Sequence, residues 1–408
     1  MSAPVVIIGA SHGGVQVAAS LRQLGFEEEI ILFSAENVLP YHRPPLSKAY
    51  LAGEKDLDQI LLKGPAFYED HRVDLRLADP VEAIDLAAGR VRARSGEQAF
   101  SKLVIATGSR PRLLKAPGHD LRGIFTLRTL SDVHALKEAM AEAQDIVIVG
   151  GGFIGLEFAS TAAKLGKTVT VIEAREKLLM RSLPATVGDF IRAYHAAHNV
   201  RFHFNAHFAE FEGESGRLRA IRLADGTRIP ADMALVGIGG EAELTLAAPL
   251  GLKLAAGGIE VDEFGRTSIG NVYALGDVAA APNLLASEPM RLESVQNAVD
   301  QAKAIAAHIL GQPAPAPVTP WFWTDQYDLK VQMAGLSRPD AVQTLRGDPD
   351  ANAFSVIETI DGKLVAVFSV NRAADHMAAR RLIAEGAFLD LSLAADAGVP
   401  LMKAVKSS

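Results

Sequence analysis

Three glycines and one glutamate in the middle of the chain have the spacing of a site for phosphates and a ribose. The glycines are Gly150, Gly152 and Gly155, in the pattern G-x-G-x-x-G, and Glu173 follows 18 residues after the last of them. In this pattern Gly150 permits a tight turn, Gly152 lets a pyrophosphate approach the backbone, and Gly155 lets a helix pack closely on a strand. A carboxylate at Glu173 can accept hydrogen bonds from ribose hydroxyls. The chemistry that these residues support is therefore the binding of a dinucleotide.

The segments around these residues predict the strand–helix–strand unit that such a site requires. They are an apolar strand over 146–149, a helix over 153–164 and a second apolar strand over 169–172. The helix N-terminus would present N–H groups and the positive end of its dipole to the phosphates. Because every part falls at the expected distance, the segment favours a dinucleotide fold over an unrelated glycine-rich loop.

A second copy of this pattern begins at Gly9, 141 residues before Gly150. The elements around it are a strand over 5–8, a helical pattern over 15–24 and a strand over 30–33. Ser11 stands where the second glycine is expected, but serine is small and its hydroxyl can bond a phosphate. Gly14 completes the pattern, and Glu36 follows it by 22 residues, within reach of a ribose. The chain therefore predicts a duplicated architecture.

Composition indicates an ordinary globular protein of two or three domains. The chain has 408 residues, of which 49% are hydrophobic and 22% charged. Its net charge of −7 argues against a general nucleic-acid role. No apolar run approaches the ~18 residues that a membrane span needs, and the N-terminal residues lead directly into a strand, without a signal-peptide pattern. We therefore expect a cytoplasmic protein that binds neither nucleic acid nor membrane.

Cysteine is absent from the sequence. The chain therefore has no disulfide, no cysteine nucleophile, and no cysteine-held zinc or iron–sulfur cluster. His195 and His198 are three residues apart, but no carboxylate motif accompanies them. We expect both histidines on an exposed helix face, and we predict no metal site.

Two further segments carry charged residues that could act with the predicted turns. Residues 41–48 form a proline-stiffened loop that carries Arg43 and Lys48. Asp277 ends the run Tyr-Ala-Leu-Gly-Asp, which reads as a short strand followed by a glycine turn. A carboxylate there lies where open α/β sheets bind ligands, with a cap or turn role as the alternative. Ser294 is a suitable N-cap for the helix that follows it.

The residues after 320 carry a β pattern and no glycine fingerprint. A proline-rich connector over 311–320 precedes them. After Trp321-Phe-Trp323, the pattern predicts strands over 330–336, 341–346, 354–360 and 363–370. Helices finish the chain, the last one starting at Pro400, because proline suits the first helical position. We predict a third, smaller domain.

The motifs occur in an order that resembles the FAD-dependent ferredoxin reductases of bacterial oxygenase systems, within the glutathione-reductase superfamily. The resemblance covers nearly all of the chain. It rests on Gly9-x-Ser-x-x-Gly14, Arg43-Pro-Pro-Leu-Ser-Lys48, Ala106-Thr-Gly108, Gly150-x-Gly-x-x-Gly155 with Leu156-Glu157, Thr267 to Asp277, Arg291-x-Glu293 and Trp321-Phe-Trp-Thr-Asp-Gln326. It implies an α/β fold with two Rossmann-like dinucleotide-binding domains, for FAD and for NAD, and a smaller α+β C-terminal domain. The implied segments are 1–111 and 243–319 for FAD, 112–242 for NADH, and 320–408 for the C-terminal domain.

The resemblance also assigns residues to the two cofactors. The implied FAD-binding residues are Gly9, Ser11, Gly14, Glu36, Arg43, Lys48, Ala106, Thr107, Gly108, Asp277, Val295 and Trp323. The implied NADH-binding residues are Gly150, Gly152, Ile154, Gly155, Glu157, Glu173 and Gly239. Within this assignment Asp277 binds the flavin ribityl chain, Lys48 flanks the flavin, and Glu157 lies by the nicotinamide carboxamide. Lys48, Glu157 and Trp323 are the implied catalytic residues, with a core or interface role as the alternative for Trp323. The helix N-terminus at Val295 is expected to face the pyrimidine end of the flavin.

Such a reductase turns a two-electron donor into a source of single electrons. Hydride passes from NADH to FAD, and electrons then pass one at a time to a [2Fe–2S] ferredoxin that feeds an oxygenase. Because the chain has no cysteine, the flavin-to-disulfide route of related enzymes is closed and the electrons must leave to an external acceptor. The alternatives are reduction of rubredoxin, a quinone or a small radical, and a flavin-bearing interaction or redox-signalling protein with slow turnover.

The resemblance further implies a surface for an acidic ferredoxin. Since the chain itself is acidic, a positive patch would have to be local. The candidates are Arg291, Lys330, Arg338 and Lys403, and the alternative is that these are ordinary solvated charges. We expect a monomer or a homodimer.

Overall fold

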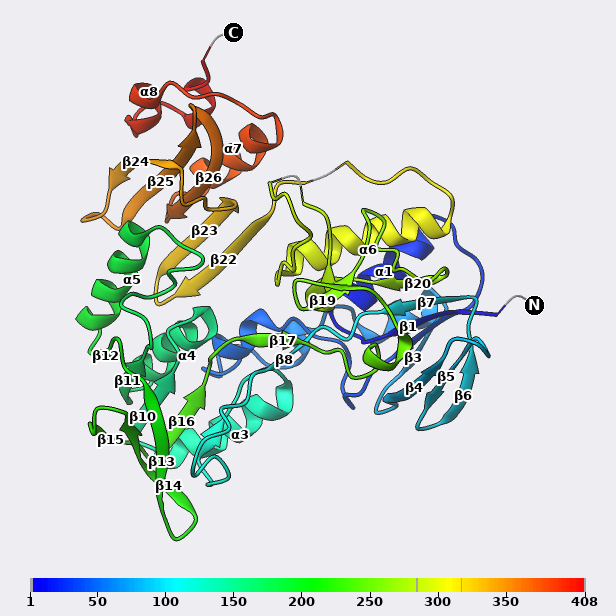
Figure 1. Ribbon diagram of the computed structural model, residues 1–408, viewed down its shortest axis with the longest axis horizontal. Coiled ribbons are helices and arrows are strands. Elements are labelled where there is room, and N and C mark those ends of the chain that lie inside the picture. Colours follow the sequence, from blue (N-terminus) through cyan, green and yellow to red (C-terminus); the bar gives the residue numbers. More distant parts are fainter. Residues whose placement is uncertain (1–2, 284, 317, 407–408) are drawn as a thin grey trace. The chain divides into compact units, whose positions relative to one another are not determined.

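The computed structural model describes residues 3–283, 285–316 and 318–406. The chain forms two compact units, and each is built from three separate segments. The first unit comprises Met1–His42, Asp56–Arg110 and Glu241–Val318, and the second comprises Arg43–Lys55, Pro111–Gly240 and Thr319–Ser408. The chain crosses between the units after His42, Lys55 and Val318, and also within β8 (Ser109–Pro111) and β17 (Gly240–Ala242) (Figure 1).

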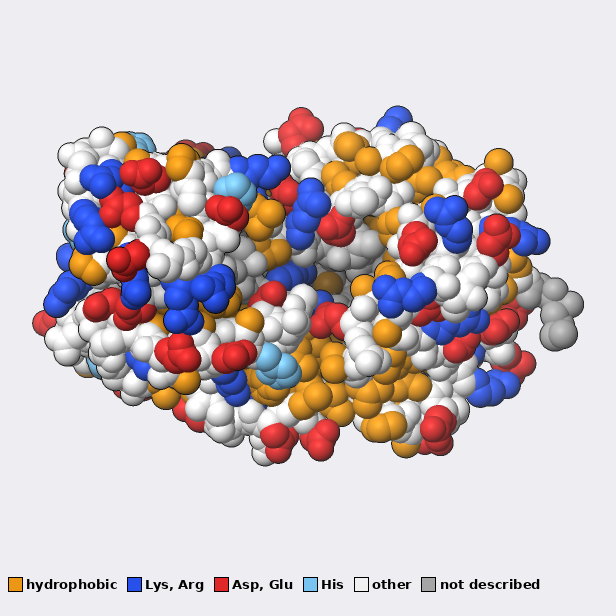
Figure 2. Space-filling model, turned by 90° about the horizontal axis from the view of Figure 1, so that it is seen from below, with side chains coloured by type: hydrophobic (Ala, Val, Ile, Leu, Met, Phe, Trp, Pro, Cys, Tyr) orange, Lys and Arg blue, Asp and Glu red, His pale blue; other side chains and the backbone are white. Residues whose placement is uncertain are grey.

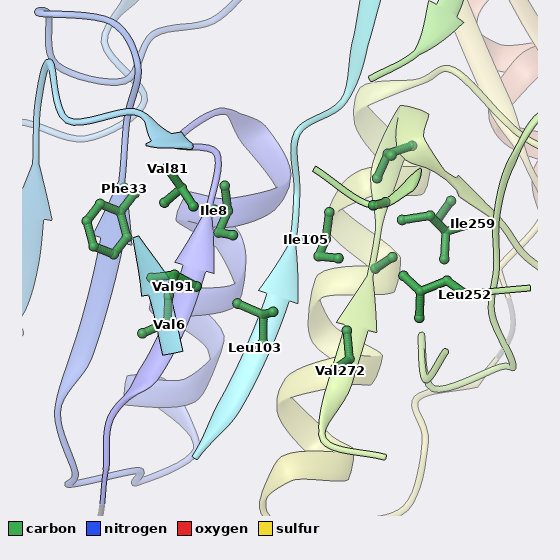
Figure 3. Packing of buried hydrophobic residues seen from close by; sticks show 14 of the residues in the cluster. Val6, Ile8, Phe33, Val81, Val91, Leu103, Ile105, Leu252, Ile259 and Val272 are labelled. Atoms are coloured by element: carbon green, nitrogen blue, oxygen red, sulfur yellow. The ribbon is translucent and has the colours of Figure 1, made fainter. Parts of the chain in front are cut away.

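The first unit is organised around a parallel sheet with the order β20-β7-β1-β2-β3. Its strands are β1 (Val5–Ile8), β2 (Ile30–Phe33), β3 (Val73–Arg76), β7 (Lys102–Ile105) and β20 (Val272–Ala274). Helices α1 (His12–Gln23) and α6 (Val295–Ile309) bury their apolar side chains in one core cluster with Val5 and Ile7. The alternate residues Val6 and Ile8 pack in a second cluster on the opposite face, part of which Figure 3 shows. Both faces of β1 and β2 are buried, which explains why these two strands are continuously apolar, whereas the edge strand β3 carries Asp74 and Arg76.

The rest of the first unit consists of small sheets and short helices. One antiparallel sheet contains β4 (Val81–Asp85), β5 (Arg90–Ala93) and β6 (Gly96–Ala99). Another contains β18 (Leu254–Ala255), β19 (Gly258–Glu260) and β21 (Ala279–Ala280). The short helices are η2 (Asp58–Ile60), α2 (Pro65–Asp70), η3 (Ala248–Leu250) and η4 (Gly276–Val278).

The second unit contains a parallel sheet of the same kind, with the order β12-β11-β10-β16-β9. Its strands are β9 (Ile124–Phe125), β10 (Asp145–Val149), β11 (Thr168–Ile172), β12 (Arg201–His203) and β16 (Met233–Val236). The helices of this segment are α3 (Leu130–Glu142), α4 (Phe153–Lys164) and α5 (Ala185–Ala197), and an antiparallel sheet contains β13 (Phe208–Glu214), β14 (Arg217–Leu223) and β15 (Arg228–Pro230). A capping box of Thr129 and Asp132 fixes the start of α3.

The C-terminal residues of the second unit form an antiparallel sheet with the order β22-β23-β26-β25-β24. Its strands are β22 (Trp321–Gln326), β23 (Leu329–Gly335), β24 (Val342–Asp348), β25 (Ala353–Ile360) and β26 (Lys363–Val370), and the helices after it are α7 (Ala373–Ala384), α8 (Leu391–Ala395) and η5 (Leu401–Lys403). Val331 and Phe368 of this sheet share a core cluster with Leu156 of α4 and Ile191 of α5. The remaining short helix, η1 (Pro44–Ser47), belongs to the same unit.

The expected α/β fold class is confirmed, as are the strands at 5–8, 30–33 and 146–149 and the helix at 153–164. The last helix was predicted wrongly, because Pro400 precedes a single 3-10 turn that begins at Leu401. The four-segment division into FAD, NADH and C-terminal domains stays a prediction. Within the described residues, every helix is too short or too polar to cross a lipid bilayer.

Candidate functional site

The carboxyl ends of four parallel strands in the first unit lie at one edge of the sheet. The register pairs Ile8 with Phe33 and with Ile105, and it pairs Ile105 with Ala274. The residues that follow these strands therefore lie at the same edge of the sheet. They are Gly9, Ser34, Ala106 and Leu275, and the predicted residues Glu36, Thr107, Gly108 and Asp277 come a few positions later. This is the edge at which open α/β sheets bind ligands.

The first glycine turn is too tight for side chains at two positions. Gly9 has φ +109°, and a Cβ there would lie 2.3 Å from the Ala106 carbonyl oxygen. A Cβ at Gly14 would lie 2.0 Å from the Gly9 carbonyl oxygen. Ser11 has φ −111° at the N-cap of α1, a conformation that any residue can adopt. The serine therefore fits the turn, and α1 begins directly after it, at His12 and not at the predicted residue 15.

The two carboxylates predicted at this edge are held in place by hydroxyl groups. Tyr41 donates to Glu36 Oε2 over 2.5 Å, and Ser109 donates to Asp277 Oδ2 over 2.9 Å. The backbone N–H of Gly276, beside Asp277, donates to Gln301 of α6 over 2.7 Å. This bond ties the turn that carries Asp277 to the helix whose first residue is the predicted Val295, and Ser294 is confirmed as that helix's N-cap.

The second glycine turn repeats this geometry in the second unit. A Cβ at Gly150, which has φ +108°, would lie 2.4 Å from the Gly237 carbonyl oxygen, and one at Gly155 would lie 2.5 Å from the Gly150 carbonyl oxygen. Gly152 differs, because its φ is −80° and the nearest atom among the described residues to a Cβ there is 3.9 Å away. Neither the backbone nor packing requires glycine at that position. Space at Gly152 fits the close approach of a pyrophosphate to the N-terminus of α4.

Glu173 lies directly beside this turn, at the end of β11. Its Oε2 accepts from the Gly151 N–H over 2.8 Å, and its Oε1 accepts from the Arg175 N–H over 2.9 Å. A carboxylate oxygen has two lone pairs, so each oxygen keeps one acceptor position beyond these bonds. Two positions side by side match the two hydroxyls of a ribose.

A partly buried ion pair joins two of the predicted catalytic residues. Lys48 Nζ lies 2.8 Å from Glu157 Oε1, and Glu157 is only 5% exposed. The Thr324 hydroxyl donates to the same oxygen over 2.7 Å, and the Ser47 hydroxyl donates to Oε2 over 2.5 Å. The pairing of Lys48 with Glu157 and both hydroxyl partners were not predicted. The sequence offered one indication of these contacts: Ser47 and Thr324 lie inside two of the motifs on which the family resemblance rests.

The other predicted residues occupy varied surroundings in the second unit. Trp323 is half-buried in β22, with its ring centroid 5.4 Å from that of Trp321. Arg43 donates to the Arg128 carbonyl oxygen over 2.5 Å. Ile154 is 47% exposed on the first turn of α4, and Gly239 has φ +101° after β16.

The prediction for His195 was wrong. His195 is fully buried on α5, with its Nε2 2.7 Å from Gln326 Oε1, whereas His198 is exposed and stacks on Tyr327. Burial lowers the pKa of His195 to about 4. Positions three apart lie on the same side of a helix, and both rings contact Tyr327. The two differ in exposure because His195 lies within α5, whereas His198 is the C-cap residue at its end.

The four candidate residues for ferredoxin docking differ in solvent exposure and in ion pairing. Arg291 is 14% exposed, pairs with Glu293 over 2.7 Å and donates to the Asp277 carbonyl oxygen. Lys330, Arg338 and Lys403 are exposed, and Arg338 lies 3.4 Å from Asp340. Figure 2 shows acidic and basic side chains interspersed on the face that it views. On that face, a positive docking surface would therefore have to be a small patch.

Two parallel sheets, each with a glycine turn at its central strand and an acid at the neighbouring strand, define a dinucleotide-dependent oxidoreductase that uses FAD and NAD(P)H. The chain belongs to the pyridine nucleotide-disulphide oxidoreductase family, whose family model matches residues 3–302. A second model, described as reductase C-terminal, matches residues 321–405.

Individual relatives resemble the chain over nearly its full length. The 5,5'-dehydrodivanillate O-demethylase ferredoxin reductase subunit of Sphingobium sp. (strain NBRC 103272 / SYK-6) is 43% identical, covering 97% of each chain. The rubredoxin-NAD(+) reductase of Pseudomonas putida is 40% identical, covering 90% of this chain and 95% of the relative. The solved structure of the covalent putidaredoxin reductase–putidaredoxin complex matches with a TM-score of 0.94 at 33% identity, covering 98% of this chain and 97% of the other.

Proposed function

We propose that this protein is an NADH:ferredoxin reductase that delivers single electrons to a [2Fe–2S] ferredoxin of an oxygenase system. The observation that carries the proposal is the absence of cysteine from a chain of the disulphide oxidoreductase family. Without a cysteine pair, electrons taken from NADH have no internal acceptor beyond the flavin. The ferredoxin reductase of Sphingobium, 43% identical, supports a ferredoxin as the external acceptor.

In this proposal each of the two glycine turns binds one cofactor. The turn from Gly9 to Gly14 would hold the FAD pyrophosphate, with Glu36 at the ribose and Asp277 at the ribityl chain. The turn from Gly150 to Gly155 would hold NADH, with Glu173 at the adenosine ribose. When bound, FAD supplies the conversion between two-electron and one-electron transfer.

The ion pair of Lys48 and Glu157 then has a role at the reacting end of NADH. Glu157 would accept a hydrogen bond from the nicotinamide carboxamide, and this fixes which face of the ring is presented. Lys48 balances the charge of the carboxylate, because an unpaired buried carboxylate would be costly. Trp323 would cover the flavin from β22.

Rubredoxin is the second candidate acceptor. It is favoured by the 40% identity to the rubredoxin-NAD(+) reductase of Pseudomonas putida. Both acceptors are small iron–sulfur electron carriers, so the chemistry of the flavin side is the same and the difference lies in the docking surface. A cytoplasmic location is part of the proposal, since the reaction draws on the cellular NADH pool.

Steady-state reduction of purified acceptors by NADH tests the proposal. We expect kcat/KM for a [2Fe–2S] ferredoxin to exceed that for rubredoxin and for a quinone by at least ten-fold, which corresponds to about 1.4 kcal/mol of preferential recognition. A higher value for rubredoxin would favour the second candidate. Slow turnover with every acceptor would instead favour a flavin-bearing interaction protein.

A further inference from the structure

A row of buried polar side chains leads from α5 to Glu157, all within the second unit. His195 Nε2 lies 2.7 Å from Gln326 Oε1, and Gln326 Nε2 lies 3.2 Å from Thr324 Oγ1. Thr324 Oγ1 lies 2.7 Å from Glu157 Oε1. His195, Gln326 and Thr324 are each 0% exposed. We call His195, Gln326 and Thr324 the donor chain.

The strand geometry explains how two members of the donor chain meet. Thr324 and Gln326 are two residues apart in β22, so their side chains leave the same face of the sheet. Trp323, directly before Thr324, points to the other face. The strand that carries the predicted flavin-covering tryptophan therefore also carries both groups that reach towards Glu157.

Each hydrogen bond in the donor chain has a fixed direction. Glu157 is ion-paired with Lys48 and can only accept, so the Thr324 hydroxyl must donate to it. That hydroxyl has one proton, so it accepts from the Gln326 amide nitrogen. The Gln326 oxygen then accepts from His195, which requires the neutral Nε2–H tautomer. Among the described residues, nothing hydrogen-bonds to His195 Nδ1, which agrees with a ring that is neutral and donates only through Nε2.

The remaining contacts of Glu157 leave one acceptor position. Oε1 accepts from Lys48 and Thr324, which uses both of its lone pairs, and Oε2 accepts from Ser47. Counting the contacts of the described residues, the fourth position is on Oε2. Three donors in fixed places prevent rotation of the carboxylate and set the direction of that position.

We propose that His195, Gln326 and Thr324 are positioning residues that orient Glu157 so that its remaining lone pair on Oε2 receives the nicotinamide carboxamide. The proposal rests on the assignment of Glu157 to the carboxamide within the proposed function. Burial of three polar groups fits this role, because hydrophobic residues would fill the same space without leaving polar groups to satisfy. The aligned directions also strengthen the last bond, since each donor polarises the next.

The test measures binding of NAD⁺ and of ADP-ribose, which lacks the nicotinamide, to the FAD-loaded protein by calorimetry. Thr324→Val keeps the shape of the side chain and removes its donor. We expect it to weaken NAD⁺ binding about ten-fold, equivalent to about 1.4 kcal/mol, and to leave ADP-ribose binding within two-fold. Thr324→Ser restores the hydroxyl and should recover most of the affinity for NAD⁺. The matched control is Thr359→Val, a buried threonine of the same sheet, which should change neither ligand's affinity.

A double-mutant cycle tests the remainder of the donor chain. Gln326→Met should weaken NAD⁺ binding about three-fold when Thr324 is present and have no effect on top of Thr324→Val. Additive effects would show that Gln326 does not act through Thr324 and would overturn the donor chain. Equal losses of NAD⁺ and ADP-ribose in Thr324→Val would indicate a purely structural role and would also overturn it.

Glu157→Ala separates this inference from the assignment on which it rests. If that variant binds NAD⁺ and ADP-ribose as the wild type does, Glu157 does not contact the carboxamide and the inference fails with the assignment. If Glu157→Ala loses NAD⁺ selectively but Thr324→Val does not, the inference alone fails. Ferredoxin reduction by the wild type is measured independently, so failure of the proposed acceptor leaves the binding result intact.

Discussion

Replacement of Glu173 by glutamine should relax a preference for NADH over NADPH. In the structure the Gly151 and Arg175 N–H groups each occupy one lone pair of a different carboxylate oxygen, and two acceptor positions remain for the ribose hydroxyls. In NADPH a 2′-phosphate replaces one ribose hydroxyl, so one of these hydrogen bonds would be lost. The Glu173 carboxylate would also repel the phosphate. A charge-assisted hydrogen bond contributes about 1.5–3 kcal/mol, so wild-type discrimination of ten-fold or more is expected.

Glu173→Gln removes the charge and replaces one acceptor by an amide group. We expect KM for NADH to rise about ten-fold, KM for NADPH to fall, and kcat to change little, because Glu173 binds the adenosine end and not the reacting ring. The assay is kcat/KM for each cofactor with ferricyanide as acceptor. Glu176→Gln is the matched control, since it removes an exposed neighbouring charge and should leave both values within two-fold.

Two cationic residues near Glu173 provide a further test of its role. Lys177 pairs with Asp189 over 2.9 Å, whereas Arg175 is exposed next to Glu173. Arg175→Ala should therefore reduce the residual activity with NADPH, and Lys177→Ala should not. Comparable efficiency of the wild type with NADH and NADPH, or an unchanged ratio in Glu173→Gln, would refute the role given to Glu173.

Three other measurements probe the flavin edge, the buried histidines and the acceptor surface. Asp277→Ala should lower the flavin content of purified protein sharply, read from the 450 nm absorbance per chain, because it removes the acceptor predicted for the ribityl chain. Acidification from about pH 6.5 to 4 should lower the melting temperature, because burial lowers the pKa of both His195 and His376 to about 4 while the unfolded chain takes up protons below about 6.5. Each histidine accounts for about 3 kcal/mol of this loss, and His195→Phe should remove its share. Rising salt should slow reduction of ferredoxin but barely change reduction of a neutral quinone, and charge reversal at Lys330 or Lys403 should raise the ferredoxin KM.

Each of these measurements has its own control. Full FAD occupancy with unchanged affinity in Asp277→Ala would exclude the ribityl contact. In the pH series, an acid slope in His195→Phe equal to that of the wild type would contradict the share given to His195. If ferredoxin and quinone respond alike to salt, or if neither reversal raises the ferredoxin KM, the docking surface lies elsewhere.

Local sequence predicted the parallel sheets well, because strands buried on both faces have a continuous apolar signature. β1, β2 and α4 have the predicted bounds, and the predicted acids Glu36, Glu173 and Asp277 all follow the carboxyl ends of parallel strands. These features depend on interactions within about thirty residues, a range over which hydrophobic period and glycine spacing are informative.

The contacts that the sequence did not predict join distant parts of the chain. Glu157 meets Lys48, 109 residues earlier, and Thr324, 167 residues later. His195 was expected on an exposed face, whereas it is buried and hydrogen-bonded to Gln326, 131 residues away. Nothing in the local pattern around either residue marks a partner at such a separation. Only the packing of α4 and α5 against the C-terminal sheet brings these groups together.

The interleaving of the two units has a consequence for the order in which the nascent chain can fold during translation. The first parallel sheet begins at Val5 but gains its edge strand β20 only at Val272–Ala274. The second parallel sheet begins and ends between Ile124 and Val236, so it can close while the first is still missing that strand. Until β20 has left the ribosome, β7 keeps an unpaired edge that another chain could join. The period of greatest exposure to aggregation therefore falls between synthesis of β7 and synthesis of β20, and a stop codon placed there should yield insoluble protein.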